Sequence, residues 1–299
     1  MINVELKGGA VKEFENGTTP AEIAKSIGAG LYKSVCCAKV DGDLCDLRTP
    51  LEKDCKVELL TFDNVDGQKT FWHTASHVLA QAVKRLYPDA KCAIGPAVDN
   101  GFYYDFDVEK PFSPEDLEKI KAEMKKIIKS GLELERVELS PEEAEKKLEE
   151  MNEPYKVELV KEHSDKGEHI TFYKQGEFID LCAGPHLMSV APIKAIELTA
   201  CTGAYWRGDA NNAQLCRVYG VAFPKASMLE EHLKKLEEAK LRDHNKLGRE
   251  LEYFTTVDYV GQGLPILLPK GARVVQLLQR WVEDVEQSKG CLLTKTPLL

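Results

Sequence analysis

Five side chains with acid–base or metal-binding chemistry lie in two short segments of the sequence. His73 and His77 are four residues apart in the segment HTASH, and Cys182 and His186 are four residues apart in CAGPH. Asp180 precedes the second segment by two residues. Three imidazoles, a thiol and a carboxylate form either a zinc site or a metal-free acid–base cluster, because both kinds of site use these groups. The spacing alone leaves both interpretations open.

The two histidines of the first segment fall on one face of a predicted helix at residues 72–86. Side chains four apart stack on the same side of a helix, so both imidazoles can converge on one point. The apolar residues of this helix cluster on its opposite side. They are Ala75, Val78, Leu79, Ala82, Val83 and Leu86. The histidines are therefore expected to face a cleft or solvent, and a solvated pair without function remains an alternative.

The second segment follows a predicted strand at residues 177–182. The alternation of a strand places Asp180 and Cys182 on one face, so they can share a site. The Gly-Pro pair that follows provides a turn that could return His186 to the side of Cys182. Because Thr rather than Glu follows His73, the general base of an HExxH metalloprotease is missing and a protease is disfavoured.

Two other patterns do not predict a nucleotide site. The run Gly261-Gln262-Gly263 is followed by Leu-Pro instead of a helix start, so it is not a dinucleotide-binding fingerprint. No Walker loop occurs in the sequence. The remaining histidines lie among charged residues and are expected on the surface. They are His163, His169, His232 and His244.

Residues 1–62 have the element order of a β-grasp, ubiquitin-like domain: strand, strand, helix, strand, strand, strand. Thr19, Pro20 and Glu22 form a helix-start signature, and Gly28 is expected to end that helix. Gly8-Gly9 and Asp41-Gly42 predict tight hairpin turns. The strands around these turns are expected at 2–6, 11–14, 35–40 and 43–47.

Residues 63–224 are expected to form an α+β domain that follows a polar linker at 63–69. Besides the helix at 72–86, helices are predicted at 114–130 and 141–151, each beginning with proline after serine. Strands are predicted as a hairpin within 93–108, near Val157, near Phe172 and at 177–182. Beyond this domain, the sequence of residues 225–252 predicts one long charged connector helix from Met228 to Leu251. In residues 253–299 a helix is predicted at 272–288, followed by a strand.

The composition indicates a multidomain protein of the cytoplasm. The 299 residues are 43% hydrophobic, and they contain neither a run of about 18 apolar residues nor a signal peptide, so no membrane association is expected. The nine cysteines suit reduced thiols, and Cys36, Cys37, Cys45 and Cys55 are expected to be packing residues. A net charge of -9 argues against a generic nucleic-acid binder, so any such contact must be local.

Several longer motifs occur in a fixed order along the chain. They are HTASH at 73–77, IGP at 94–96, NGFYYD at 100–105, DLC at 180–182, GPH at 184–186, AYWRGD at 204–209 and RDH at 242–244. In this order they resemble the editing part of bacterial threonyl-tRNA synthetases. The likeness covers essentially the whole chain, and it identifies the sequence as similar to the N-terminal part of that family.

The resemblance implies a domain order. Residues 1–62 are similar to the TGS domain, 63–224 to the editing domain of the threonyl/alanyl-tRNA synthetase type, and 225–252 to the connector helix. Residues 253–299 look like the truncated start of the class II catalytic domain, with its motif 1 near 290–297. Ala183 stands where the family frequently has Arg, and Cys291, Leu293 and Thr294 depart from the usual motif 1.

The resemblance also implies a function. Threonine exceeds serine by one methyl group, which allows a synthetic pocket only about 1–3 kcal/mol of discrimination, so a second hydrolytic site is needed. The site is therefore expected to hydrolyse mischarged seryl-tRNA(Thr) in proofreading. In this interpretation His73 activates water with the assistance of Asp180, and Tyr104 contacts the substrate. Lys156 offsets negative charge, while His77, Cys182 and His186 shape the pocket and position water.

The resemblance favours metal-free hydrolysis, with no cofactor in this part of the family's chain. Motifs 2 and 3, with ATP, magnesium and the catalytic zinc, would lie beyond Leu299, so neither aminoacylation nor the full-length homodimer is expected here. One alternative is an editing-site zinc held by His73, His77, Cys182 and His186, as in related alanyl-tRNA editing proteins. The others are a non-catalytic tRNA-binding or regulatory module and a structural zinc domain.

Overall fold

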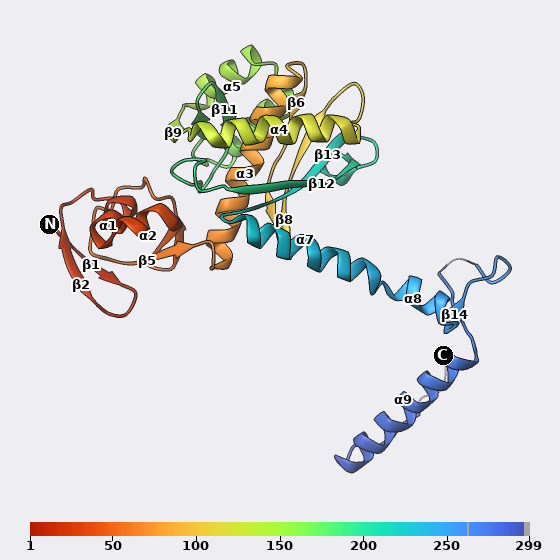
Figure 1. The fold of residues 1–299 in the computed structure, drawn as a ribbon. Coiled ribbons are helices and arrows are strands. Elements are labelled where there is room, and N and C mark those ends of the chain that lie inside the picture. The colour runs from red at the N-terminus through yellow and green to blue at the C-terminus, as the bar shows by residue number, and fades with distance from the viewer. Residues whose placement is uncertain (262, 296–299) are drawn as a thin grey trace. The chain divides into compact units, whose positions relative to one another are not determined.

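The computed structural model describes residues 1–261 and 263–295, and Figure 1 shows its ribbon. The chain divides into two compact units, Met1–Leu229 and Glu230–Leu299. Within the described residues, every helix is too short or too polar to cross a membrane. The nine cysteines are free thiols.

The N-terminal region is a five-stranded sheet with two helices on it. The sheet order is β2-β1-β5-β3-β4, and β1 runs parallel to β5, which confirms the predicted β-grasp pattern. Thr19 and Glu22 form the expected capping box, while the short helix α2 was not predicted. The elements are β1 (Ile2–Leu6), β2 (Val11–Phe14), α1 (Pro20–Ile27), α2 (Ala29–Ser34), β3 (Val35–Val40), β4 (Asp43–Cys45) and β5 (Cys55–Thr61).

Helix α3 (Val65–Leu86) occupies most of the segment that was predicted to be a linker. The backbone at Gly67 lies so close to β5 that a Cβ atom there would be 2.0 Å from the carbonyl oxygen of Thr61. The side chain of Asn64 also accepts a hydrogen bond from the amide of Thr61, at 3.2 Å. The linker prediction is wrong because the first turn of this polar segment packs directly against the preceding strand.

Helix α3 packs against the larger sheet of the second region. The order of this sheet is β12-β13-β8-β6, with β7 paired to β8. Helix α3 contacts β8 and β13, and α4 contacts α3 and β12. The elements are β6 (Lys91–Cys92), β7 (Ala97–Val98), β8 (Gly101–Asp107), α4 (Pro114–Ser130), β12 (Ala195–Tyr205), a 3-10 helix at Trp206–Gly208 and β13 (Gln214–Phe223). The hairpin predicted within 93–108 is present as β7 and β8.

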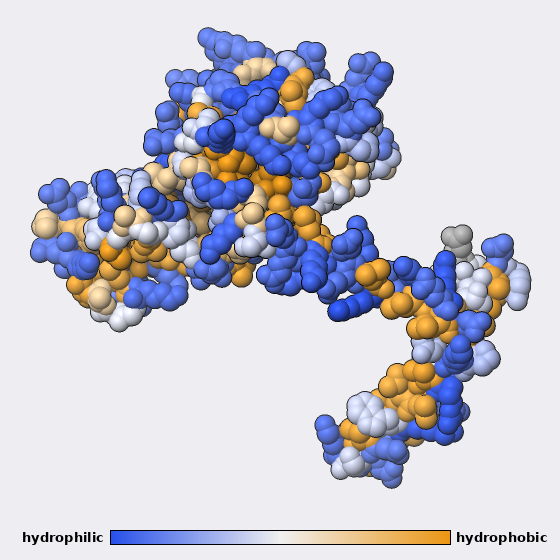
Figure 2. Space-filling model, viewed as in Figure 1, coloured by the Kyte–Doolittle hydropathy of each residue, from blue (hydrophilic) through white to orange (hydrophobic). Residues whose placement is uncertain are grey.

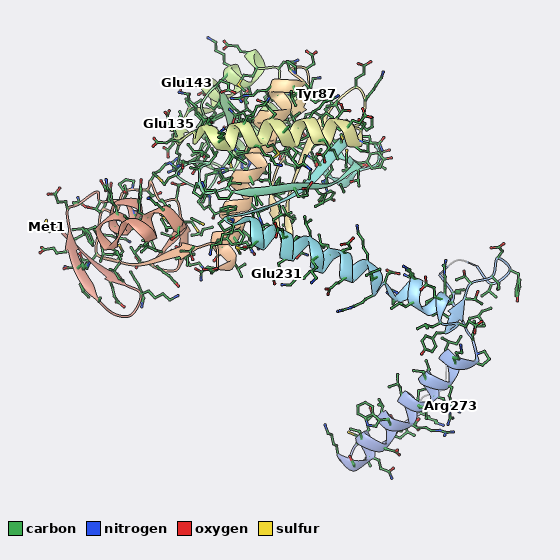
Figure 3. All side chains as sticks on the ribbon, in the orientation of Figure 1. Met1, Tyr87, Glu135, Glu143, Glu231 and Arg273 are labelled. Carbon is green, nitrogen blue, oxygen red and sulfur yellow. The ribbon has the colours of Figure 1, made fainter. Side chains whose placement is uncertain are left out.

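A smaller sheet, in the order β11-β10-β9, carries Asp180 and leads into the second segment of candidate residues. Its strands are β9 (Leu134–Glu138), β10 (Thr171–Gln175) and β11 (Phe178–Leu181), and its helices are α5 (Pro141–Glu150) and α6 (Pro154–Asp165). Glu143, labelled in Figure 3, completes the capping box of α5. The strand predicted near Val157 is wrong. Val157 and Val160 are three residues apart and both pack into one apolar cluster, as a helix face requires.

The C-terminal part also differs from the predicted single connector. Helix α7 (Ala226–Leu241) ends before Asp243, whose side chain caps the separate helix α8 (His244–Glu250). A two-stranded pair follows, β14 (Phe254–Thr255) with β15 (Ile266–Leu267), and then α9 (Pro269–Ser288). Residues 291–295 are not a strand, and the rest of the predicted terminal strand lies outside the described residues.

Candidate active site

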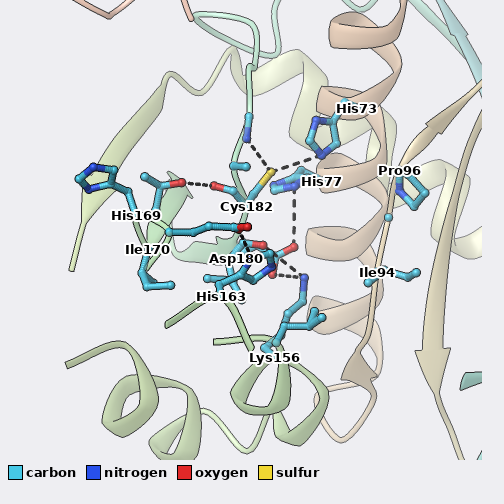
Figure 4. A pocket seen from close by; sticks show the side chains of 17 residues that line it. His73, His77, Ile94, Pro96, Lys156, His163, His169, Ile170, Asp180 and Cys182 are labelled. Carbon is cyan, nitrogen blue, oxygen red and sulfur yellow. Dashed lines mark hydrogen bonds and ion pairs between the residues drawn. The ribbon is translucent and has the colours of Figure 1, made fainter. Parts of the chain in front are cut away.

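Helix α3 and the loop after β11 meet at one point, although they are far apart in the sequence (Figure 4). The Sγ atom of Cys182 lies 3.3 Å from Nε2 of His73 and 3.2 Å from Nε2 of His186. The ring centroids of His77 and His186 are 4.2 Å apart. The turn after Cys182 thus returns His186 to the thiol, as the Gly-Pro pair suggested.

A buried ion pair completes the cluster from below in Figure 4. The ammonium of Lys156, on α6, lies 2.8 Å from Oδ1 of Asp180. The hydroxyl of Tyr104 donates to Oδ2 of the same carboxylate at 2.6 Å. His77 is the imidazole that the structure places near Asp180, with Nε2 at 3.8 Å from Oδ2. His77 is thus the nearer imidazole to Asp180, while the charge of Asp180 also acts on His73 and opposes the lowering of its pKa.

Burial keeps the imidazoles neutral. It lowers the pKa of His73 to about 4 and that of His77 to about 3, even though the charge of Asp180 acts in the opposite direction. It also lowers the pKa of His186, which is fully buried, well below its ordinary value. At neutral pH all three rings can accept a proton or bind a metal ion.

In this environment the Cys182 thiol is neutral, whereas the Asp180 carboxylate is negatively charged. Burial raises the pKa of Cys182 to about 12, although the amide of Gly184 lies 3.3 Å from the sulfur and opposes the shift. The thiol is therefore protonated and is a poor nucleophile. Burial would also raise the pKa of Asp180, but Lys156 and His77 outweigh it and the net shift is downward. Asp180 is the charged acceptor of the cluster.

Thr74 determines which nitrogen of His186 carries the proton. Its hydroxyl donates to the carbonyl of Thr70 at 3.0 Å, so its oxygen can only accept other hydrogen bonds. It accepts from the amide of Leu187 at 3.0 Å and lies 3.2 Å from Nδ1 of His186. Nδ1 must then be the protonated nitrogen, and Nε2 presents its lone pair to Cys182. No sequence pattern distinguishes Thr74, because threonine is common in helices without such a role.

A cavity of about 360 Å³ opens over the cluster. His73, His77 and Cys182 form part of its wall, together with Lys156 and Asp180. His186 and Tyr104 are fully buried behind that wall. Tyr104 thus orients Asp180, and its position does not support the predicted substrate contact.

The rim of the cavity contains two histidines that were expected on the general surface. His163 and His169 both line it, and His163 makes a 2.5 Å contact with Glu168. Their lack of a periodic pattern gave no signal for this position. The pocket can accept a polar group of moderate size, because cavities that bind small ligands usually begin at about 300 Å³.

The side chains of the cluster below the cavity, from α3 and the Cys182 loop, also fit a zinc ion. The ligand atoms of His73, His77, Cys182 and His186 all lie within 4.8 Å of one another. Within the described part of the chain, Nδ1 of the buried His77 has no hydrogen-bond partner. Four protein ligands complete a tetrahedron, which is typical of structural zinc, whereas catalytic zinc keeps a position open for water. The donor set thus fits zinc, but in a closed site.

Comparisons with known proteins match both regions of the chain. The TGS domain matches residues 2–61, and the threonyl and alanyl tRNA synthetase second additional domain matches residues 170–219, which include Asp180, Cys182 and His186. Over 299 residues the chain is 58% identical to the threonine–tRNA ligase of Clostridium perfringens. The chain is homologous to bacterial threonine–tRNA ligases. This finding agrees with the resemblance that the sequence motifs indicated.

Two further relatives of the same name show similar agreement. The chain is 56% identical to the threonine–tRNA ligase of Clostridium botulinum and 53% identical to that of Acetivibrio thermocellus, each over 299 residues. All of this chain is covered in these comparisons, but only 46% or 47% of each relative. The chain therefore spans about half the length of the curated relatives that it matches.

Proposed function

We propose that the cavity over α3 and the Cys182 loop hydrolyses the ester of seryl-tRNA(Thr) and so removes wrongly attached serine. The observation that carries this proposal is the convergence of His73, His77 and Cys182, from two distant segments, in one cavity. The homology to threonine–tRNA ligases supports the choice of substrate, because these enzymes must distinguish threonine from serine.

In the proposed reaction a water molecule attacks the ester carbonyl while neutral His73 takes its proton. His73 is suited to this step because its ring is neutral and borders the cavity. The bond between the carbonyl carbon and the ribose oxygen then breaks. The His73 imidazolium returns its proton to that oxygen, which leaves free serine and the tRNA hydroxyl.

The ion pair contributes electrostatic stabilisation to this step. Lys156 places a positive charge at the cavity wall, where negative charge develops on the attacked carbonyl oxygen. Asp180 balances this charge in the ground state and, through its charge, favours protonation of both imidazoles on α3. Asp180 thereby stabilises the imidazolium that forms during the reaction.

A deacylation assay tests the proposal. The purified chain is mixed with threonine tRNA charged with serine or with threonine, and release of the amino acid is followed. We expect the serine ester to be hydrolysed at least about tenfold faster, the order of discrimination that one methyl group supports. The variant His73→Ala is the control for contaminating hydrolases and should lose the activity. Equal rates for both esters, or no hydrolysis of either, would contradict proofreading.

A structural zinc site is the second candidate, and the closed His3Cys arrangement favours it. Metal analysis of the purified protein separates the two. Stoichiometric zinc that is lost in His73→Ala, together with unfolding by a chelator, would replace metal-free hydrolysis by a structural role.

The name of these relatives, threonine–tRNA ligase, also describes ligation of threonine to tRNA. We propose that this reaction depends on segments of the relatives outside the part that matches this chain. tRNA is accordingly proposed as the partner of the residues described here, through its aminoacylated 3′ end.

A further inference from the structure

Asp46 connects the N-terminal β-grasp region with the backbone of the loop after β11, which carries Cys182 and His186. It follows β4, and its side chain is only 6% exposed. Its Oδ2 atom accepts a hydrogen bond from the amide of His186 at 3.2 Å and one from the hydroxyl of Tyr173 at 2.8 Å. A carboxylate from the first region therefore holds the N–H side of the residue whose ring faces Cys182.

Arg48 holds the carbonyl side of the same loop. Its guanidinium donates to the carbonyl oxygens of His186 at 3.3 Å, Leu187 at 2.7 Å and Leu134 at 2.9 Å. It also pairs with Oδ1 of Asp46 at 3.0 Å. Because the guanidinium is a rigid planar fork, it ties two carbonyls of the loop to the first residue of β9, and it fixes them more strictly than a single charge would.

The contacts around His186 are complementary. Thr74, on α3, holds the ring at Nδ1, while Asp46 and Arg48 hold the main chain on both sides of the residue. Met188, two residues further along, packs against the apolar core of the first region. The direction of the Nε2 lone pair toward Cys182 thus depends on residues of both regions.

We propose that Asp46 and Arg48 are positioning residues of the hydrolytic site, so that the first region is part of the machinery that orients His186. This inference rests on the proposed hydrolysis. It assigns to the β-grasp region a role in the reaction, in addition to its own fold. Residues that orient groups of a site in this way commonly change activity by 10–100-fold when they are removed.

The experiment compares three variants of the full chain: Asp46→Asn, Arg48→Met and the control Asp54→Asn. Asp54 lies in the same region, and its carboxylate accepts bonds from the main and side chains of Asn3, far from the loop in sequence. Deacylation of serine-charged tRNA gives kcat and KM, and thermal unfolding verifies the fold. We expect kcat to fall by about 10–100-fold in the first two variants, with KM nearly unchanged and the control like the parent.

A second readout does not require activity. NMR of ¹⁵N-labelled histidine rings reports the tautomer and environment of His186, whose signals are assigned with His186→Gln. The parent should show a protonated Nδ1, and Asp46→Asn and Arg48→Met should shift or broaden this signal. Arg48→Lys keeps the charge without the fork, so it should resemble Arg48→Met.

These readouts separate the proposed hydrolysis from the positioning role of Asp46 and Arg48. If the parent hydrolyses the ester and the folded variants match Asp54→Asn in kcat, the positioning role is refuted. If the parent does not hydrolyse the ester, the proposed function fails, and the ring signals alone decide the positioning of His186. His186 ring signals that are unchanged in both Asp46→Asn and Arg48→Met would overturn the inference. If Asp46→Asn unfolds, Arg48→Met and Arg48→Lys still test it.

Discussion

The side chains of the site balance one another in charge and hydrogen bonding. Lys156 and Asp180 are 5% and 4% exposed, so each charge would be costly without the other. Tyr104 supplies a further hydrogen bond to the carboxylate. The three imidazoles are neutral and the thiol is protonated. The Lys156–Asp180 ion pair therefore determines the electrostatic potential at the site without adding net charge to it.

The variant Lys156→Met leaves the Asp180 charge buried without its partner. We expect the free energy of unfolding to fall by about 3–5 kcal/mol, the usual cost of breaking a buried pair. The pKa of Asp180 should rise because its main stabilising cation is lost. Denaturant unfolding measures the first effect. Lys161→Met, on the same helix but more than half exposed, is the control and should change stability by less than about 0.5 kcal/mol.

The variant Thr74→Val removes the hydroxyl that accepts from His186 and from the amide of Leu187. Valine has a similar shape, so the helix should persist, but two buried donors lose their acceptor. We expect hydrolysis to fall by at least about tenfold, whereas Thr74→Ser, which keeps the hydroxyl, should retain most activity. Equal activity in the valine and serine variants would show that the tautomer of His186 does not matter.

Spacing predicted that the histidines of one segment and the cysteine of another would converge, but it did not predict the residues that hold them. His73, His77 and Cys182 were predictable because unusual residue types recur at intervals that a helix or strand brings together. Thr74 and Arg48 act through hydrogen bonds to atoms that are distant in the sequence. Such contacts depend on tertiary packing, and an isolated threonine or arginine gives no local pattern.

At the scale of elements, α3 joins the parts of the first unit. It starts directly after β5, packs against the larger sheet and carries two of the imidazoles. The close approach of Gly67 to the backbone of Thr61 sets its starting point. The position of the histidines over the loop is thus coupled to the packing of the first region.

A Cβ atom at Gly67 should disturb this junction. In Gly67→Ala the new atom would meet backbone at 2.0 Å, which cannot move aside as a side chain could. We expect a loss of about 1–3 kcal/mol in the free energy of unfolding, as for other overpacked positions. Gly30→Ala is the matched control, because Gly30 also lies in a helix and has open space around it. A control that loses as much as Gly67→Ala would disprove the steric explanation.

Element prediction succeeded where the local signals were strong. The serine-proline starts of α4 and α5 and the glycine turns of the first sheet are local features, and the structure has them. The wrong assignments at 63–69, Val157 and the connector came from short polar or mixed segments. There, the packing of one face or a cap such as Asp243 decides the structure, and the sequence shows neither directly.

At the scale of the molecule, the cluster of His73, His77, Cys182 and His186 lies entirely within the unit Met1–Leu229. The other unit contains α9, and Figure 2 shows apolar residues gathered along it. Leu277, Leu278 and Trp281 are 49%, 55% and 63% exposed. Such a patch is typical of a surface that another chain segment or subunit covers.

A shortened chain of residues 1–229 should therefore fold and hydrolyse serine-charged tRNA at the rate of the full chain. The reason is that every member of the cluster, and the Asp46 and Arg48 contacts, are retained. Single-turnover deacylation and thermal unfolding measure the two expectations. A folded but inactive 1–229 chain would show that the second unit contributes to the reaction.

The central claim is that the α3 imidazoles and the Cys182 loop act as one hydrolytic site. A double-mutant cycle with His73→Ala and Cys182→Ala, measured by single-turnover hydrolysis of serine-charged tRNA(Thr), tests it directly. Groups that act as a unit give strongly non-additive effects, so the double variant should be about as slow as the slower single variant. Fully additive losses in the logarithm of the rate would contradict the claim, because they would show that the two segments act independently.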